Sequence, residues 1–132
     1  TELLGRASHR IDAFVCANDA LAGGVIDALS TKGLAGGVLI VGGDGTASAV
    51  GRLREGTQHA TVFYDPIALA EETVRAAVAL ARGAIDLSSL PSRSPAVNPP
   101  SRLVPALDVP LQFITRENVT DLEQFWAAAS PI

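Results

Sequence analysis

Three short apolar runs, each followed by polar residues and then by a helix-like segment, organise the first half of the chain. The runs cover residues 11–17, 38–41 and 60–63. Apolar runs of four to eight residues that alternate with helical segments are typical of strands in a parallel sheet. The pattern predicts the order β-α-β-α-β-α, an α/β fold whose strands are joined by right-handed crossovers.

The segments between the runs carry helix start and stop signals. Residues 19–32 place Leu21, Val25, Ala28 and Leu29 at helical spacing, and Gly33 follows as a C-cap. Thr46 or Ser48 is expected to cap a second helix that ends at Gly56. A third helix is expected to begin at Pro66 and to end at Arg82-Gly83.

The composition changes in residues 87–110, which contain six of the eight prolines and several serines. This segment is expected to be a long surface loop. A strand at 111–115 and a helix at 117–128 follow, and the helix carries an apolar stripe of Val119, Leu122, Phe125 and Trp126. We therefore expect a core at 1–86, a loop at 87–110, and a returning strand and helix of the same domain at 111–132.

The length and charge of the chain exclude several classes of protein. The 132 residues suit one domain, since 48% are hydrophobic, 18% are charged and the net charge is −4. The arginines are scattered, so a nucleic-acid surface is not expected. Cys16 is the only cysteine, which excludes an internal disulfide and a cysteine-based metal site, and neither metal nor cofactor is expected.

Polar residues follow each of the three predicted strands, and they are the candidate site. Asn18, Asp19, Asp44, Tyr64 and Asp65 stand at the three strand ends. Consecutive parallel strands place their carboxyl ends at one edge of the sheet, where open α/β sheets bind ligands. Carboxylates accept from adjacent hydroxyls and amides both donate and accept, as a polyol ligand requires. Helix capping is the alternative role of each aspartate and asparagine.

One motif favours an enzyme instead. Residues 42–46, Gly-Gly-Asp-Gly-Thr, match the GGDGT signature of the diacylglycerol- and NAD-kinase superfamily. A strand-to-helix turn also favours glycine for its permissive φ angle, without any catalytic role. The sequence shows no Ser/His/Asp arrangement and no paired carboxylates on one helix face, so we expect binding and not catalysis.

A longer match points to a family of binding proteins. Residues 11–24, IDAFVCANDALAGG, resemble the "IDAVVASNDATAGG" region of periplasmic sugar-binding proteins of the xylose- and ribose-binding type. VGGDG at 41–45 is similar to their "VGFDG" or "SGQDA" turn, and GTQHATV at 56–62 followed by Pro66 resembles "GTQTMTVYKP" or "ATIAQLP". VPLQFITRENV at 109–119 is similar to "VVTKDNV". The resemblance covers roughly residues 8–120, in the same order as in the family.

The resemblance implies the C-terminal lobe of a type I periplasmic-binding-protein-like fold, with a three-layer parallel-sheet architecture. It implies that Asn18 and Asp44 bond the hydroxyls of a pentose-like monosaccharide, and that Tyr64 stands where the family presents Gln or Lys. It further implies a non-catalytic solute-binding component that serves an ABC permease. The full-length protein would be periplasmic or extracellular and lipoprotein-like, although this chain carries no signal peptide.

Half of a two-lobed clamp leaves its ligand in water, so millimolar binding is expected for these residues alone. The exposed lobe face is a candidate homodimer surface. The same fold also serves as the effector-binding domain of LacI-type transcription regulators, which is the alternative function. The proline that such regulators tend to show after the second helix is absent from residues 33–38.

Overall fold

The computed structural model of the chain describes residues 11–86, 92–93, 104–105 and 108–129. Contacts divide the chain into two units, one of Thr1–Tyr64 with Leu111–Ile132 and one of Asp65–Pro110. The second unit contains the third predicted helix, and each unit is described by itself below.

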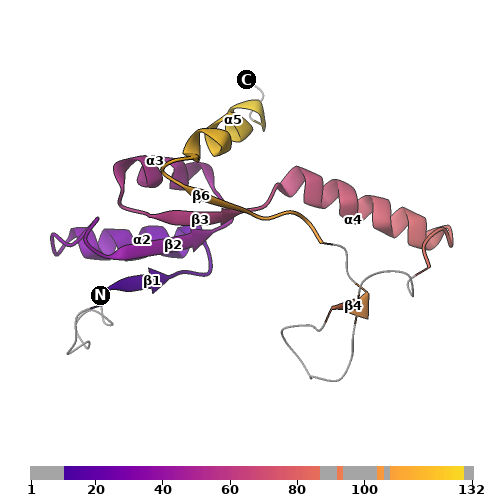
Figure 1. Cartoon of the computed structure of the whole chain (residues 1–132), viewed down its shortest axis with the longest axis horizontal. Helices are drawn as coiled ribbons and strands as arrows, with labels where there is room; N and C mark the ends of the chain where they lie inside the picture. Colours follow the sequence, from indigo (N-terminus) through magenta and orange to yellow (C-terminus); the bar gives the residue numbers. More distant parts are fainter. Residues whose placement is uncertain (1–10, 87–91, 94–103, 106–107, 130–132) are drawn as a thin grey trace. The chain divides into compact units, whose positions relative to one another are not determined.

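A four-stranded sheet with the order β1-β2-β3-β6 forms the centre of the first unit (Figure 1). The strands are β1 (Ala13–Val15), β2 (Leu39–Gly43), β3 (Ala60–Phe63) and β6 (Gln112–Thr115). The first three are parallel, as the sequence pattern predicts, and β6 runs antiparallel to β3. The carboxyl ends of β1, β2 and β3 consequently share one edge.

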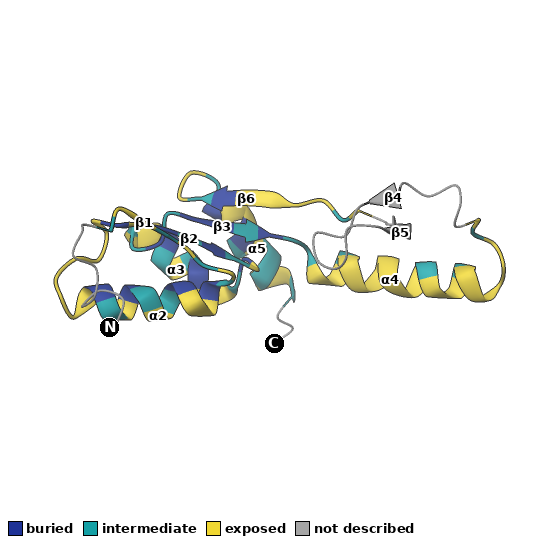
Figure 2. Ribbon diagram, turned by 90° about the horizontal axis from the view of Figure 1, so that it is seen from below, coloured by how far each residue is buried: buried dark blue, intermediate teal, exposed yellow. Residues whose placement is uncertain are grey.

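Three helices lie on one face of this sheet (Figure 2): α2 (Asp19–Ser30), α3 (Ala47–Glu55) and α5 (Val119–Ala129). Under α2 an apolar cluster gathers Ala22, Ile26, Leu29, Val38 and Ile40, with Cys16 at its border. Burial raises the pKa of the Cys16 thiol. Under α3 and α5 a second cluster gathers Leu53, Phe63, Ile114, Val119 and Leu122.

The buried face of α2 differs from the predicted one. Leu21 was expected inside, but 56% of it is exposed, while Ala22, Ile26 and Leu29 are buried. Apolar residues surround most of this helix, so periodicity alone could not choose between neighbouring faces. The packing against Val38 and Ile40 makes that choice.

The helix ends follow their local signals. Gly56 adopts a left-handed φ of 78° and caps α3, as expected. The C-cap of α2 is Thr31 and not Gly33; Gly33, two residues further on, has a left-handed φ of 66° and donates its N–H to the Ser30 carbonyl. Thr46 is the N-cap of α3 by position, yet its side chain makes no capping bond to that helix.

The opposite face of the sheet presents apolar side chains to solvent. Val15 is 85% exposed, Leu39 47% and Phe113 58%. These residues alternate along their strands with side chains that pack under the helices, so they share one face. Within this unit, the described residues form the sheet and one layer of helices.

The second unit is built around α4 (Pro66–Ala81). The Asp65 carboxylate accepts from the N–H groups of Ile67 and Ala68, and Pro66 occupies the first turn, as the sequence predicts. No residue of α4 is buried, although most of its side chains are apolar. β4 (Ser92–Arg93) and β5 (Val104–Pro105) pair antiparallel inside the segment predicted as a loop. The remainder of residues 87–107 lies outside the described residues.

We predict that two leucine substitutions in α2 will have very different costs. Leu29→Ala empties a fully buried site and should lower the free energy of unfolding by about 2–5 kcal/mol. Leu21→Ala, at an exposed position of the same helix, should change it by less than about 1 kcal/mol. Urea denaturation followed by circular dichroism measures both. Equal losses would show that α2 packs in the rotation expected from its sequence.

Candidate functional site

The carboxyl edge of β1, β2 and β3 brings three of the five expected site residues together. Asn18 follows β1, Asp44 follows β2 and Tyr64 follows β3, on strands that are neighbours in the sheet. The loop after β1 touches the end of β2 closely, since a Cβ added at Gly43 would lie 3.0 Å from the Ala17 carbonyl oxygen. The three strand ends are neighbours at this edge, as strand order predicts.

Asn18 is the N-cap of α2. Its Oδ1 accepts from the Leu21 N–H at 2.9 Å, which fixes the side chain and satisfies one of the free N–H groups of the first turn. Its Nδ2 donates to no partner among the described residues. The amide therefore caps the helix and still offers two donors at the edge of the sheet.

Asp44 occupies the centre of the turn between β2 and α3 with a φ of 84°, the only positive φ of a non-glycine residue in the described chain. Aspartate tolerates this left-handed conformation better than most residues, at a cost of roughly 1–3 kcal/mol. The residue is exposed, and its carboxylate has no hydrogen-bond partner among the described residues. A strained backbone thus presents an unpaired acceptor to solvent.

Tyr64 and Asp65 follow β3 at the boundary between the two units. Tyr64 ends the first unit and is half-buried, two residues beyond Val62, which pairs with Gly43. Asp65 begins the second unit, and one of its carboxylate oxygens is engaged in the cap of α4. Tyr64 therefore shares an edge with Asn18 and Asp44, while Asp65 has a structural task in α4.

Asp19 is fully buried, and both of its carboxylate oxygens accept hydrogen bonds from the protein. Oδ1 accepts from Gln58 Nε2 at 2.7 Å. Oδ2 accepts from the Thr46 backbone N–H at 2.8 Å and from Thr46 Oγ1 at 3.1 Å. A buried carboxylate is tolerated when it is bonded in this way. Asp19 links α2 to the start of α3 and to the segment before β3.

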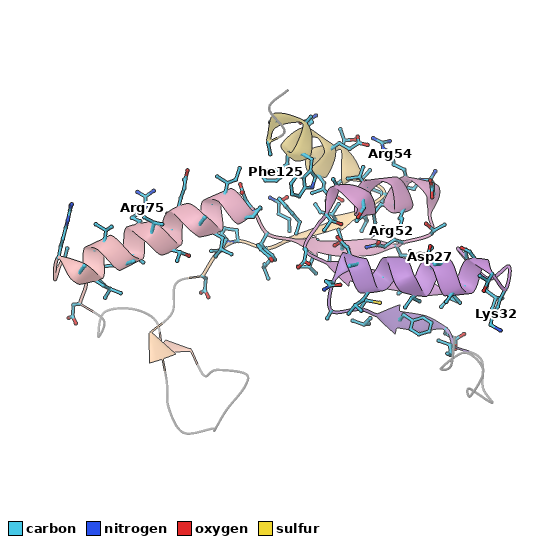
Figure 3. The ribbon with its side chains drawn as sticks, turned by 180° about the vertical axis from the view of Figure 1, so that it is seen from behind. Asp27, Lys32, Arg52, Arg54, Arg75 and Phe125 are labelled. Atoms are coloured by element: carbon cyan, nitrogen blue, oxygen red, sulfur yellow. The ribbon has the colours of Figure 1, made fainter. Side chains whose placement is uncertain are left out.

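Arg52 completes this buried network from α3 (Figure 3). Its Nε donates to Gln58 Oε1 at 2.9 Å, and its Nη2 donates to the Asp19 carbonyl at 3.0 Å. Gln58, only 1% exposed, is held by Arg52 on its oxygen side, and its nitrogen donates to Asp19 and to the Ala60 carbonyl at 3.2 Å. Every polar atom of the Gln58 side chain therefore has a partner.

The turn that carries Asp44 is fixed at several points. The Gly45 N–H donates to Thr61 Oγ1 at 3.2 Å, and the Gly45 carbonyl accepts from the Trp126 indole at 2.9 Å. The next N–H, of Thr46, is the one bonded to Asp19. The sequence reading did not identify Thr46, Arg52, Gln58, Thr61 and Trp126 as parts of the site. Gln58 and Thr61 lie in the segment 56–62 that resembles the family, but nothing in the sequence assigned them to this network.

The chemistry of this edge suits binding to hydroxyl groups. It offers a free carboxylate, amide donors and a phenol on rigid elements. Within the described residues, no group of three or more His, Cys, Asp or Glu side chains could hold a metal ion. In the same part of the chain, no helix has the length and hydropathy that a bilayer-spanning helix requires.

Comparison with known proteins assigns the family. Residues 1–85 match the family described as periplasmic binding protein domain. The chain belongs to this family. It is 38% identical over 102 residues, 77% of the chain, to the D-xylose-binding periplasmic protein of Escherichia coli (strain K12), of which it covers 31%.

Solved structures show the same fold, that of the type I periplasmic binding proteins. A twin-arginine translocation pathway signal protein from Burkholderia phytofirmans superposes with a TM-score of 0.71 at 29% identity, over 99% of this chain and 37% of that one. An ABC transporter solute-binding protein from Bacillus halodurans with bound myo-inositol gives 0.69 at 28% identity, over 94% and 37%. The chain thus spans about a third of the length of these relatives.

These findings confirm the family and the α/β fold expected from the sequence. The names of these relatives, a D-xylose-binding periplasmic protein and an ABC transporter solute-binding protein, agree with the binding role expected from the sequence. The Gly-Gly-Asp-Gly-Thr segment covers the last two residues of β2 and the turn to α3, and it lies within the residues that match the periplasmic binding protein family.

We predict that the close contact of β2 with Asp19 makes Gly42 irreplaceable. A Cβ at Gly42 would lie 2.3 Å from Asp19 Oδ1 and 2.7 Å from Gln58 Nε2, so Gly42→Ala should cost about 1–3 kcal/mol. Gly24→Ala, in α2 with no atom within 4 Å, should instead gain about 0.5–1 kcal/mol. Thermal and urea denaturation measure both. A neutral Gly42→Ala would mean that the Asp19 network adapts without loss.

Proposed function

We propose that the chain is part of a monosaccharide-binding component of an ABC importer, and that it contacts the sugar through the carboxyl edge of its sheet. The observation that carries this proposal is the alignment of Asn18, Asp44 and Tyr64 on three neighbouring strand ends. By their names, the relatives bind D-xylose and myo-inositol. This supports a pentose or a similarly hydroxylated ring as the ligand.

Each of these residues has a distinct task in the proposal. The exposed carboxylate of Asp44 accepts from two adjacent hydroxyls, and Asn18 donates through its free Nδ2. Tyr64 stacks on the ring or bonds a hydroxyl. Asp19 and Asp65 act as positioning residues and not as ligand contacts. The oxygens of Asp19 hold the β2–α3 turn, and an oxygen of Asp65 caps α4.

The partners and the location follow from the same family. We propose a membrane permease of the ABC type as the protein partner and the periplasm as the place of work, as the descriptions of the relatives suggest. The relatives are about three times as long as the chain, so the sugar would be enclosed by a second lobe. The exposed apolar surface of α4 supports a further polypeptide layer.

We predict that the chain by itself binds D-xylose or myo-inositol no more tightly than roughly millimolar, because half of the site faces water. Two-dimensional NMR titration should move the backbone signals of residues 18, 44 and 64. Asp44→Asn should weaken binding at least about tenfold, since charged hydrogen bonds are worth about 1.5–3 kcal/mol. Asp27→Asn, at an exposed position of α2, is the control and should bind normally.

Asp44→Gly separates binding from folding at the same position. Glycine adopts the φ of 84° without strain, so stability should stay constant or rise by up to about 1 kcal/mol while sugar binding disappears. Loss of stability together with retained binding would assign Asp44 a structural role only. A titration in which no sugar moves any strand-end signal would refute the proposed function.

We further propose that two copies of the chain associate through the open sheet face. Parallel sheets are normally covered on both faces, and this face presents Val15, Leu39 and Phe113 with no charged side chain among the described strand residues that share it. A second copy offers the same apolar surface, so two copies can cover each other.

Sedimentation velocity tests this association over a range of concentrations. The chain should pass from monomer to dimer, and the double variant Val15→Thr with Phe113→Thr should remain monomeric, since threonine keeps the strand propensity and removes the apolar surface. Leu34→Ser changes an exposed leucine outside the strands and should leave the dimer intact. A monomer at all concentrations would contradict the proposal.

A further inference from the structure

The Gly45–Thr46 peptide unit, one residue beyond Asp44, is held at its carbonyl and at its N–H by side chains from distant parts of the chain. In the Gly45–Thr46 peptide, the carbonyl accepts from Trp126 Nε1 at 2.9 Å and the N–H donates to Asp19 Oδ2 at 2.8 Å. Trp126 lies in α5, 81 positions away from Gly45. The helix at the end of the described chain therefore touches the turn that carries the free carboxylate.

Aromatic rings pack against one another between Gly45 and the Trp126 indole. Gly45 lies against Phe63, so closely that an added Cβ would be 2.5 Å from the ring. The Phe63 ring meets the Phe125 ring edge-on at 5.0 Å between centroids, and Phe125, labelled in Figure 3, meets Trp126 at 5.2 Å. The contacts close a circuit from Gly45 through Phe63, Phe125 and Trp126 back to the Gly45 carbonyl.

The circuit matters because it adds a restraint on the Gly45 carbonyl, in a turn whose N–H groups at Gly45 and Thr46 are held by Thr61 and Asp19. Gly43 and Gly45 flank Asp44, and glycine reaches both signs of φ at little cost. Gly45 has a φ of 62° and Asp44 a φ of 84°, so two successive residues are left-handed. The direction of the Asp44 side chain depends on those angles, and the angles depend on where the neighbouring peptide groups are bonded.

We propose that Trp126 is a positioning residue for ligand binding: its indole N–H holds the Gly45 carbonyl and thereby fixes the direction of the Asp44 carboxylate. This inference rests on the proposed function, in which Asp44 contacts the sugar. Trp126 itself does not touch the ligand. It lowers the cost of binding because the turn is ordered before the ligand arrives.

The same contact provides an internal signal. The chain contains a single tryptophan, so its fluorescence and its indole N–H resonance both arise from Trp126. A ligand on Asp44 alters the polarity and order of the peptide group to which that indole is bonded. Sugar binding should shift the emission of Trp126 and its indole ¹H–¹⁵N signal with the same concentration dependence as the backbone signal of Asp44.

Trp126→Phe tests the role, since phenylalanine keeps an aromatic ring in the circuit and removes the donor. In the 132-residue chain without ligand, amide hydrogen exchange should accelerate at Gly45 and Thr46 but not at Ile40, which lies under α2. With D-xylose as the probe, affinity should fall about three- to tenfold, the range of one neutral hydrogen bond. Thr61→Val removes the other anchor of Gly45 and should have the same local effects.

Glu123→Ala is the matched control in α5. It breaks the ion pair with Arg54 between α5 and α3 without touching the turn, so it should leave exchange at Gly45 and affinity for D-xylose unchanged. Equal acceleration of exchange at Ile40 and Gly45 in Trp126→Phe would mean a general loss of stability and would overturn the proposal. If the wild-type chain binds D-xylose, an equal affinity in Trp126→Phe would also overturn the proposal.

Failure of the proposed function is recognised separately. If the wild-type chain binds no sugar while exchange accelerates only at Gly45 and Thr46, the positioning of the turn by Trp126 stands and the choice of ligand is wrong. If the wild type binds D-xylose while its indole signal stays constant throughout the titration, the function stands and the role of Trp126 is refuted.

Discussion

The buried carboxylate of Asp19 is the constraint on which the arrangement of the sheet edge depends. A carboxylate removed from water is costly unless donors replace the lost hydration, and three donors from Thr46 and Gln58 do so here. These donors come from the segments that follow β2 and precede β3, so the bonds form only when both strands are in place. The requirement of Asp19 for partners therefore aligns three strand ends. A network in which each member is bonded rigidifies its surroundings, whereas removal of one member leaves a buried polar group unpaired.

The sequence was most informative where the structural cause is local. The alternation of apolar runs and helical segments predicted β1, β2 and β3 and their common direction, and Gly56 and Pro66 marked helix ends by their own backbone preferences. The sequence failed where the cause lies elsewhere in the chain. The buried side of α2 depends on its packing against Val38 and Ile40, which lie outside the helix.

The difference between local and distant causes also explains which site residues could be predicted from the sequence. Asn18, Asp44 and Tyr64 could be placed at one edge because strand order alone brings parallel strand ends together. Asp19 looked equivalent to Asn18, since the two are neighbours and both suit a ligand or a cap. Their different roles result from a partner 39 residues away, Gln58, and from the Thr46 N–H. The contact of Trp126 with Gly45 spans 81 residues, and an apolar stripe in a terminal helix gives no indication of it.

In the proposed function, the left-handed conformation of Asp44 separates the source of selectivity from the source of affinity. A non-glycine residue at a φ of 84° persists only where its surroundings impose it, and here the following two backbone N–H groups are fixed by Thr61 and Asp19. The cost of ordering this turn is thus met in folding and not in binding. What this edge lacks is exclusion of water, because Asp44 is exposed and hydroxyls already bond well to solvent. In the proposed function, its rigidity provides selectivity for the positions of hydroxyls, while affinity comes from a second surface that covers the ligand.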